Sequence, residues 1–240
     1  MSKKIVVAID LGTSRSAYAY SIQGRAEGDI IIKVPKGSLP SVSTMKTDTA
    51  VLLRNTNFHD VVAFGQAAGE RFIEECEDDD ASFEQGIGAS SLFRRFKTTL
   101  CERHDYESID CPVATAEVGQ QLPLIVVMTA VLRHFKNDVI AHLCSVSEVA
   151  QTISDVTWVV TITAIYDDFT KRFMRVAARK AGIISTVDTP NLQLYLEPEA
   201  ACLTVSLKNA PHLARDGTKI MILDCGGGTV DITSHEVLCP

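Results

Sequence analysis

The sequence of 240 residues predicts a mixed α/β protein, in which helices flank a sheet of parallel and antiparallel strands. Short apolar segments follow one another within residues 5–34, which is typical of antiparallel strands joined by turns. Apolar residues recur every three to four positions within residues 119–144, which predicts a helix that faces the core. The nearly continuous apolar segment 157–163 is typical of a buried strand.

The first strand begins at Ile5 and reaches Asp10, where a turn through Gly12 leads into a second strand that ends at Ile22. Residues 30–34 supply a third strand. Consecutive strands joined by short turns form an antiparallel meander. We therefore expect Asp10 and Gly12 at the tip of a hairpin.

Residues 36–118 are more polar and predict an inserted subdomain that contains a strand at 50–54. The acidic run at 74–80 is expected in a surface loop, because contiguous like charges repel and cannot all face one ion. The next expected elements are the helix 119–144, with Pro123 in its first turn, and the strand 157–163. A helix from Asp167 or Asp168 to Gly182 and a strand at 183–187 are expected to follow. The last two are a short strand that starts at Leu192 and a helix with Pro198 in its first turn.

The composition argues against several classes of partner. A net charge of −7 with scattered basic residues argues against nucleic acid. No apolar stretch approaches the roughly 18 to 20 residues that span a bilayer, so we expect a cytoplasmic or nuclear protein without a membrane partner. The seven cysteines form no CxxC pair, which favours reduced and mostly buried thiols over disulfides or a zinc site. Cys225 is expected in the core.

Two glycine-containing turns follow an acidic residue that ends an apolar strand. Gly12 follows Asp10, and the three glycines 226–228 follow Asp224. Glycine lets backbone N–H groups approach a phosphate closely, and neighbouring hydroxyls add donors. Carboxylates are hard ligands that hold hydrated Mg²⁺. The pair of turns therefore predicts a phosphate site, whereas either turn alone is equally compatible with a turn that binds nothing.

A strand, not a helix, follows the second turn, since residues 230–236 alternate in polarity. The dinucleotide fingerprint and the Walker A loop both open into a helix. Neither motif therefore describes this chain.

Three motifs resemble a known set: Asp-Leu-Gly-Thr at 10–13, Glu-Pro-Glu-Ala-Ala at 197–201 and Asp-Cys-Gly-Gly-Gly-Thr-Val-Asp at 224–231. They are similar to the phosphate-1, connecting and phosphate-2 motifs of the actin, sugar-kinase and 70-kDa heat-shock protein superfamily. The paired alanines and the triple glycine resemble the heat-shock chaperones, and residues 159–183 resemble their divergent twelfth subfamily. Thr163 departs from the family's proline, which puts the family's coupling between domains in doubt.

This resemblance implies a ribonuclease-H-like (actin-like) ATPase fold with two lobes. Residues 1–35 and 119–207 would form the base of the first lobe, residues 36–118 its inserted subdomain, and residues 208–240 the first hairpin of an incomplete second lobe. The adenosine-binding motif and the substrate-binding domain of the family have no counterpart here. We therefore expect these residues by themselves to bind ATP weakly, if at all, and to be weak or inactive in hydrolysis.

The resemblance also implies roles for single residues in binding ATP or ADP with Mg²⁺. Lys97, within a segment that resembles the family's lysine-carrying segment, would orient the γ-phosphate, and Glu197 would bind a water. Without the resemblance, Lys97 would be a surface lysine and Glu197 a carboxylate that stabilises a helix N-terminus. By the same resemblance, Asp10 and Asp224 would hold the waters of Mg²⁺, and Asp224 would also be catalytic. The residues that would contact the phosphates are Gly12, Thr13, Ser14, Gly226, Gly227, Gly228 and Thr229.

The function implied is that of an ATPase domain of a divergent heat-shock chaperone, which converts ATP to ADP and phosphate in the full-length protein. Its partners would be nucleotide and, by resemblance, client proteins, co-chaperones or nucleotide-exchange factors. Two alternatives stay open: a nucleotide-gated scaffold that binds ATP without hydrolysing it, and a small-molecule kinase of the same superfamily.

Overall fold

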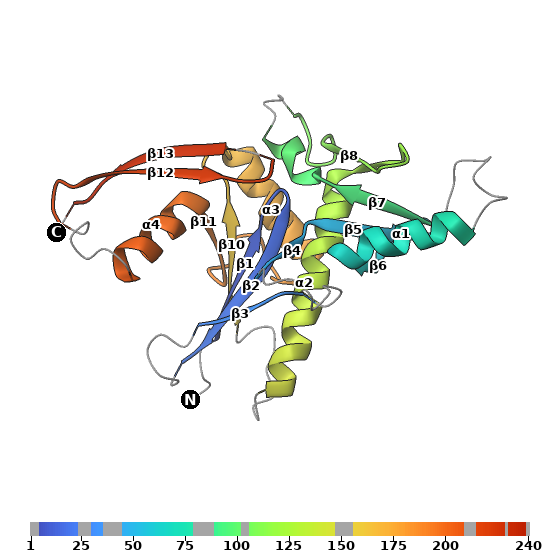
Figure 1. The fold of residues 1–240 in the computed structure, drawn as a ribbon, viewed down its shortest axis with the longest axis horizontal. Coiled ribbons are helices and arrows are strands. Elements are labelled where there is room, and N and C mark those ends of the chain that lie inside the picture. Colours follow the sequence, from blue (N-terminus) through green and yellow to red (C-terminus); the bar gives the residue numbers. More distant parts are fainter. Residues whose placement is uncertain are drawn as a thin grey trace.

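The computed structural model describes residues 5–23, 30–35, 45–78, 89–101, 106–146, 156–208, 215–228 and 230–238. Within these residues the chain is a mixed α/β protein, as the sequence predicts, and its mixed sheet with flanking helices fits an actin-like ATPase fold (Figure 1). No helix in this part of the chain is long and apolar enough to cross a membrane.

The main sheet contains the predicted antiparallel meander. Its strands lie in the order β11-β10-β1-β2-β3, and β4 pairs with the end of β2. β1 runs antiparallel to β2 and parallel to β10, and both β1 and β10 lie inside the sheet. The bounds of the strands are β1 Ile5–Leu11, β2 Arg15–Ile22, β3 Ile31–Lys33, β4 Thr47–Asp48, β10 Val156–Ile162 and β11 Leu192–Leu196.

A second sheet of three strands, in the order β6-β5-β7, lies beside the main sheet with helix α1 against it (Figure 1). A short ribbon of β8 and β9 precedes the long helix α2. Phe135 of α2 contacts the rings of both Tyr18 in β2 and Phe64 in β6, so this helix joins the two sheets in one core. The bounds are β5 Ala50–Arg54, β6 Asn57–Phe64, α1 Gln66–Asp78, β7 Ser90–Arg94, β8 Val113–Thr115, β9 Gln121–Pro123 and α2 Leu124–Val146.

The C-terminal part of the main sheet leads into a separate hairpin. Helix α3 (Asp168–Lys180) follows β10, and helix α4 (Glu197–Lys208) follows β11. The hairpin of β12 (Lys219–Cys225) and β13 (Val230–Glu236) forms its own two-stranded sheet. In Figure 1 this hairpin crosses above α4, and its turn approaches the tip of the β1–β2 hairpin.

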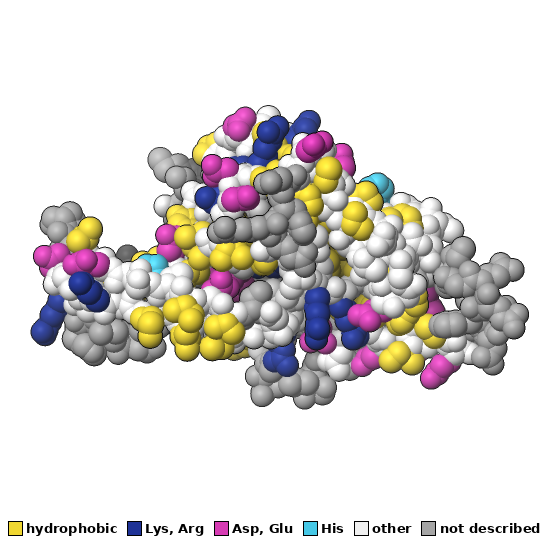
Figure 2. Space-filling view, turned by 90° about the horizontal axis from the view of Figure 1, so that it is seen from above, with side chains coloured by type: hydrophobic (Ala, Val, Ile, Leu, Met, Phe, Trp, Pro, Cys, Tyr) yellow, Lys and Arg dark blue, Asp and Glu magenta, His cyan; other side chains and the backbone are white. Residues whose placement is uncertain are grey.

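One face of the β12–β13 hairpin is exposed and apolar. Side chains alternate in burial along both strands. Figure 2 shows hydrophobic side chains gathered on the half of the molecule that carries this hairpin. The exposed face is formed by Met221, Leu223, Cys225, Val230 and Ile232. An exposed apolar face on a two-stranded hairpin is a site for aggregation unless another surface covers it.

Four expectations about local structure are wrong. Residues 121–123 form β9, so helix α2 begins after Pro123 rather than before it. Residues 183–187 form no strand, because the N–H of Ile183 donates to Ala178 O and helps to end α3. The acidic residues up to Asp78 continue helix α1 instead of forming a loop, while residues 79–80 lie outside the described part.

The fourth correction concerns the cysteines. All six that the structure describes are free thiols, as expected, but none of them is buried. Cys225 is exposed because its side chain lies on the outer face of β12, and Cys239 lies outside the described residues.

Asp167 caps helix α3 and supplies a first test of stability. Its carboxylate accepts hydrogen bonds from Thr170 N at 2.8 Å and Thr170 Oγ1 at 2.7 Å. These bonds, the backbone one first, lower the pKa of Asp167 below its ordinary value of 3.8. A carboxyl group with a lowered pKa stabilises the folded state above its unfolded pKa and loses that effect as the pH falls.

We therefore expect Asp167→Ala to lower the free energy of unfolding by about 1 kcal/mol at pH 7. The difference from wild type should shrink as the pH falls below about 4, where the wild-type carboxyl becomes protonated. Urea unfolding at several pH values measures this. Asp167→Asn, which keeps an acceptor oxygen, should lose less and show no such pH dependence. A loss that is the same at low and neutral pH would contradict the assigned role of the charge.

Candidate functional site

The first glycine turn is tight, and Thr13 within it is buried. Gly12 N donates to Arg15 O at 3.2 Å across the turn between β1 and β2. A side chain at Gly12 would place its Cβ 2.5 Å from that same oxygen, so only glycine fits this turn. Thr13 is buried with 7% of its surface exposed. The backbone at the tip of the hairpin is therefore held in one conformation.

The second glycine turn lies against the first. A Cβ built on Gly227 would lie 2.5 Å from Ser14 Oγ, and one built on Gly228 would lie 2.6 Å from Thr13 Cγ2. Such distances are too short for any real side chain, so the two turns approach more closely than residues larger than glycine allow. The structure thus brings together two turns that lie more than 200 positions apart in the sequence. Thr229 lies outside the described residues.

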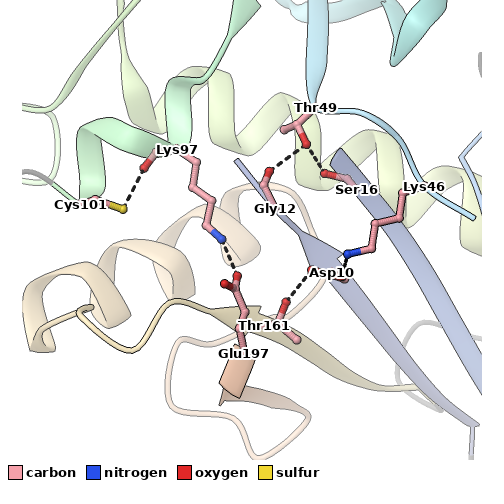
Figure 3. A network of polar contacts seen from close by, with 9 residues as sticks. All are labelled: Asp10, Gly12, Ser16, Lys46, Thr49, Lys97, Cys101, Thr161 and Glu197. Atoms are coloured by element: carbon pink, nitrogen blue, oxygen red, sulfur yellow. Dashed lines mark hydrogen bonds and ion pairs between the residues drawn. The ribbon is translucent and has the colours of Figure 1, made fainter. Parts of the chain in front are cut away.

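Asp10, at the end of β1, has partners on both carboxylate oxygens. Lys46 Nζ lies 2.5 Å from Oδ2, and Thr161 Oγ1 donates to Oδ1 at 3.2 Å (Figure 3). Thr161 lies beside Asp10 because β1 and β10 pair in parallel with Ile9 opposite Val160. Lys46 comes from the segment just before β4, so the ion pair joins two regions of the chain.

Thr49 supports the first turn from the same segment. Its hydroxyl donates to Gly12 O at 2.8 Å and lies 2.6 Å from Ser16 Oγ (Figure 3). The backbone N–H of Thr49 donates to Ser14 O at 2.8 Å. Residues 46–49 therefore fix both the carboxylate and the backbone of the first turn.

Lys97 is buried and paired with Glu197. It lies in a 3₁₀ helix, Phe96–Leu100, which follows a residue with positive φ, Arg95 at 51°. Its side chain is 2% exposed, and Nζ lies 2.7 Å from Glu197 Oε1 (Figure 3). Lys97 is thus not a surface lysine. Glu197 does begin helix α4, where a carboxylate is also favoured by the helix dipole.

Aromatic and acidic groups surround this ion pair. The Lys97 ammonium lies 5.9 Å from the centre of the Tyr166 ring. Burial raises the pKa of Tyr166 well above its ordinary value, and the charges of Cys101, Glu197 and Asp231 add to this shift, so the phenol stays neutral. Burial also raises the pKa of the Cys101 thiol, although the charge of Lys97 opposes the shift. The negative charge of Asp231 in β13 also contributes to the raised pKa of the Cys101 thiol.

Asp224 and Asp231 lie directly opposite each other in the β12–β13 ladder. Directly opposed side chains lie on the same face of a sheet, and like charges in such positions repel. The charge of Asp231 on this face is among the causes that raise the pKa values of Tyr166 and Cys101. A cation near the two carboxylates would relieve their repulsion.

The described residues fit a hydrated Mg²⁺ by the chemistry of their donors. Asp10 and Asp224 offer hard oxygen ligands beside the two turns, which is the type of donor that holds Mg²⁺ through its waters. No group of three or more acidic, histidine or cysteine side chains in the described part forms a cage that could hold a metal ion by itself. The ion would therefore depend on water and on a bound phosphate for most of its ligands.

The sequence did not predict that Lys46, Thr49, Thr161 and Tyr166 contribute to this site. Lys46 and Thr49 were assigned only to the inserted subdomain, and their contacts with the turn are tertiary. The alternation of threonines around Lys46, Thr44-Met45-Lys46-Thr47-Asp48-Thr49, contains no recognisable motif. Tyr166 follows the departure at Thr163 and carries no signal of its own.

Comparison with known proteins adds to this geometry. No protein-family model matches the chain. Heat shock 70 kDa protein 12A of Homo sapiens is 29% identical over 98% of this chain and 41% of its own length. Heat shock 70 kDa protein 12B of Homo sapiens is 26% identical over 100% of this chain and 41% of its own length. The chaperone protein dnaK of Emiliania huxleyi is 26% identical over 97% of this chain and 32% of its own length.

The chain is a homologue of the 70-kDa heat-shock proteins. The resemblance inferred from the three motifs, including that to the twelfth subfamily, is thereby confirmed. The chain spans about two fifths of the length of its 12A and 12B relatives, since 41% of each is matched. The match extends over almost all of this chain, so both glycine turns and the segment that carries Lys97 fall inside it.

Proposed function

We propose that the two glycine turns bind the phosphates of one ATP molecule with Mg²⁺, and that this chain is the N-terminal part of a nucleotide-binding, ATP-hydrolysing domain. The observation that carries the proposal is the contact of Gly227 and Gly228 with Ser14 and Thr13. The N–H of Gly12 donates to Arg15 O, so the N–H groups of Thr13 and Ser14, together with those of the glycines 226–228, would bind the anion.

Each site residue has a place in this proposal. Gly12, Thr13 and Ser14 would bind phosphate from one side, and Gly226, Gly227, Gly228 and Thr229 from the other. Bound Mg²⁺ would neutralise charge on the β- and γ-phosphates, which is a main requirement of phosphoryl transfer. Asp10 and Asp224 would orient its waters.

Lys97 and Glu197 would act at the γ-phosphate. The buried ammonium is held between Glu197 and Tyr166, so it keeps its position without a ligand. A preorganised cation stabilises the charge of a transition state without further rearrangement. Glu197 Oε1 already accepts from Lys97, and the carboxylate would position a water next to it.

The names of the relatives support a chaperone context. Heat-shock 70 kDa and DnaK-type proteins cover this chain over nearly its whole length. By this analogy the complete protein would couple ATP binding to clients, co-chaperones or exchange factors. The lobe boundaries, residues 1–35 with 119–207, 36–118 and 208–240, are proposed on the same basis. A cytoplasmic or nuclear location is proposed because the six described cysteines are free thiols.

Titration calorimetry with ATP on the complete protein, with and without Mg²⁺, tests the proposal. Wild type should bind ATP, and Asp224→Asn should bind more weakly only when Mg²⁺ is present, because the substitution removes a charge that holds the ion. Asp216→Asn, in the turn before β12, serves as a charge-matched control. Equal binding by both variants in both conditions would contradict the role of Asp224, and no binding by wild type would contradict the proposal.

Hydrolysis separates the ATPase from its alternatives. Release of phosphate in a single turnover supports the ATPase, whereas binding without release supports a nucleotide-gated scaffold. Transfer of the phosphate to a sugar in place of water would support a small-molecule kinase.

A further inference from the structure

Lys46 occupies a position at the proposed magnesium site that no sequence motif assigns. Its ammonium lies 2.5 Å from Asp10 Oδ2, the carboxylate that would hold the waters of Mg²⁺. At this distance the ammonium donates a charge-assisted hydrogen bond to the carboxylate, and such a bond is stronger than one between neutral groups. The carboxylate is therefore already neutralised by the chain itself.

The segment that carries Lys46 is fixed to the phosphate-binding turn. Thr47 and Asp48 pair with Ser16 and Arg15 of β2, and Thr49 bonds to Gly12 and Ser14. The side chains of Lys46 and Asp10 are 47% and 38% exposed, so the ammonium can leave the carboxylate without exposing any core residue. It would then still lie within reach of a phosphate bound at the same turn.

We infer that Lys46 is a built-in cation that substitutes for Mg²⁺ at Asp10 and sets how strongly nucleotide binding depends on the metal. This inference rests on the proposed function. Without Mg²⁺, the ammonium screens Asp10 from the negative charge of ATP. With Mg²⁺, the hydrated ion and Lys46 compete for the same carboxylate oxygen, so the lysine weakens the benefit of the metal.

The measured quantity is the dissociation constant of ATP in EDTA divided by the dissociation constant of ATP in excess Mg²⁺. Both constants are obtained by calorimetry on the whole chain. Lys46→Met should raise this ratio about three- to tenfold above the wild-type value, since an exposed ion pair and its phosphate contact are each of modest strength. Binding in EDTA should weaken, because Asp10 then faces ATP without a counter-ion. Lys46→Arg, which keeps the charge, should restore a ratio close to wild type.

Arg54→Met is the matched control. It breaks the pair of Arg54 with Asp60, whose atoms lie 2.8 Å apart and whose side chains are 46% and 47% exposed, at the far end of β5 from Thr49. This variant should keep the wild-type ratio. The double variant Lys46→Met/Asp10→Asn should lose most of the effect of Lys46→Met, because no carboxylate remains to be screened.

The outcomes separate this inference from the proposed function. A ratio for Lys46→Met equal to that of wild type, with ATP bound in both conditions, would overturn the inference alone. An equal rise for Arg54→Met would also overturn it, since the effect would then be one of net charge. Failure of every variant and of wild type to bind ATP in either condition would overturn both.

Discussion

Replacing Lys97 with alanine is expected to slow single-turnover hydrolysis of ATP by a hundredfold or more while leaving ATP affinity within several-fold of wild type. The reason is that the ammonium is 2% exposed and fixed on Glu197 at 2.7 Å, so water cannot replace it in the same position. Rapid-quench measurement of phosphate release, on the complete protein, checks the rate. Equilibrium binding of ATP checks the affinity.

The same substitution should lower stability, because it leaves the Glu197 carboxylate, 16% exposed, without its partner. We expect a loss of about 3 kcal/mol, near the lower end of the cost of breaking a buried pair. Lys97→Ala/Glu197→Gln should recover part of this loss without recovering turnover. Lys171→Ala, at a lysine that is 45% exposed, is the control and should change neither quantity. Turnover by Lys97→Ala within threefold of wild type would contradict the catalytic role.

Replacing Gly227 with alanine is expected to weaken ATP binding at least tenfold. The added Cβ would lie 2.5 Å from Ser14 Oγ and 2.8 Å from Ser14 Cβ, so the two turns must separate. Displacement of the N–H groups by about 1 Å is enough to disrupt a site in which both turns bind one anion. The melting temperature should change little, because Gly227 is exposed and lies outside the core.

Removal of the opposing side chain provides the matched control. Ser14→Gly should bind ATP somewhat more weakly than wild type, since it loses one hydroxyl donor. Ser14→Gly/Gly227→Ala should nevertheless bind better than Gly227→Ala alone, because the clash is gone. If the double variant binds ATP no better than Gly227→Ala, the contact between the turns does not control binding.

Local pattern was enough to predict most elements of the main sheet. The apolar strand from Ile5 and the turn at Gly12 together predicted a hairpin. The nearly continuous apolar segment 157–163 predicted a strand inside the sheet, and the structure has this strand at Val156–Ile162. Gly182 has the positive φ of 74° expected of a glycine that ends a helix. In each case the decisive interactions are between neighbours in sequence or within one regular element.

The expectations that failed depend on contacts that pattern does not encode. Ile183 and Ile184 are apolar and look like part of a strand, yet the backbone of Ile183 is used to end α3. Proline is tolerated both in the first turn of a helix and at the end of a short strand. Pro123 belongs to a strand because it pairs with Val113 of β8.

In the candidate site, too, local motifs could be read from the sequence, whereas tertiary contacts could not. The motifs predicted that Asp10, Lys97, Glu197 and the glycines belong to one site, and the structure places Lys97 on Glu197 and the second turn on the first. Motifs gave no indication of Lys46, because its pairing with Asp10 arises from how β4 docks on β2. The sequence carries no local signal for contacts between distant segments.

The most direct test of the central claim is a titration of the ¹⁵N-labelled chain with MgATP, followed by the backbone amide resonances of the two turns. The account predicts that Gly12, Thr13 and Ser14 shift together with Gly226, Gly227 and Gly228, and that both sets give the same dissociation constant. Shifts confined to one turn, or two different constants, would contradict the claim that both turns bind a single triphosphate.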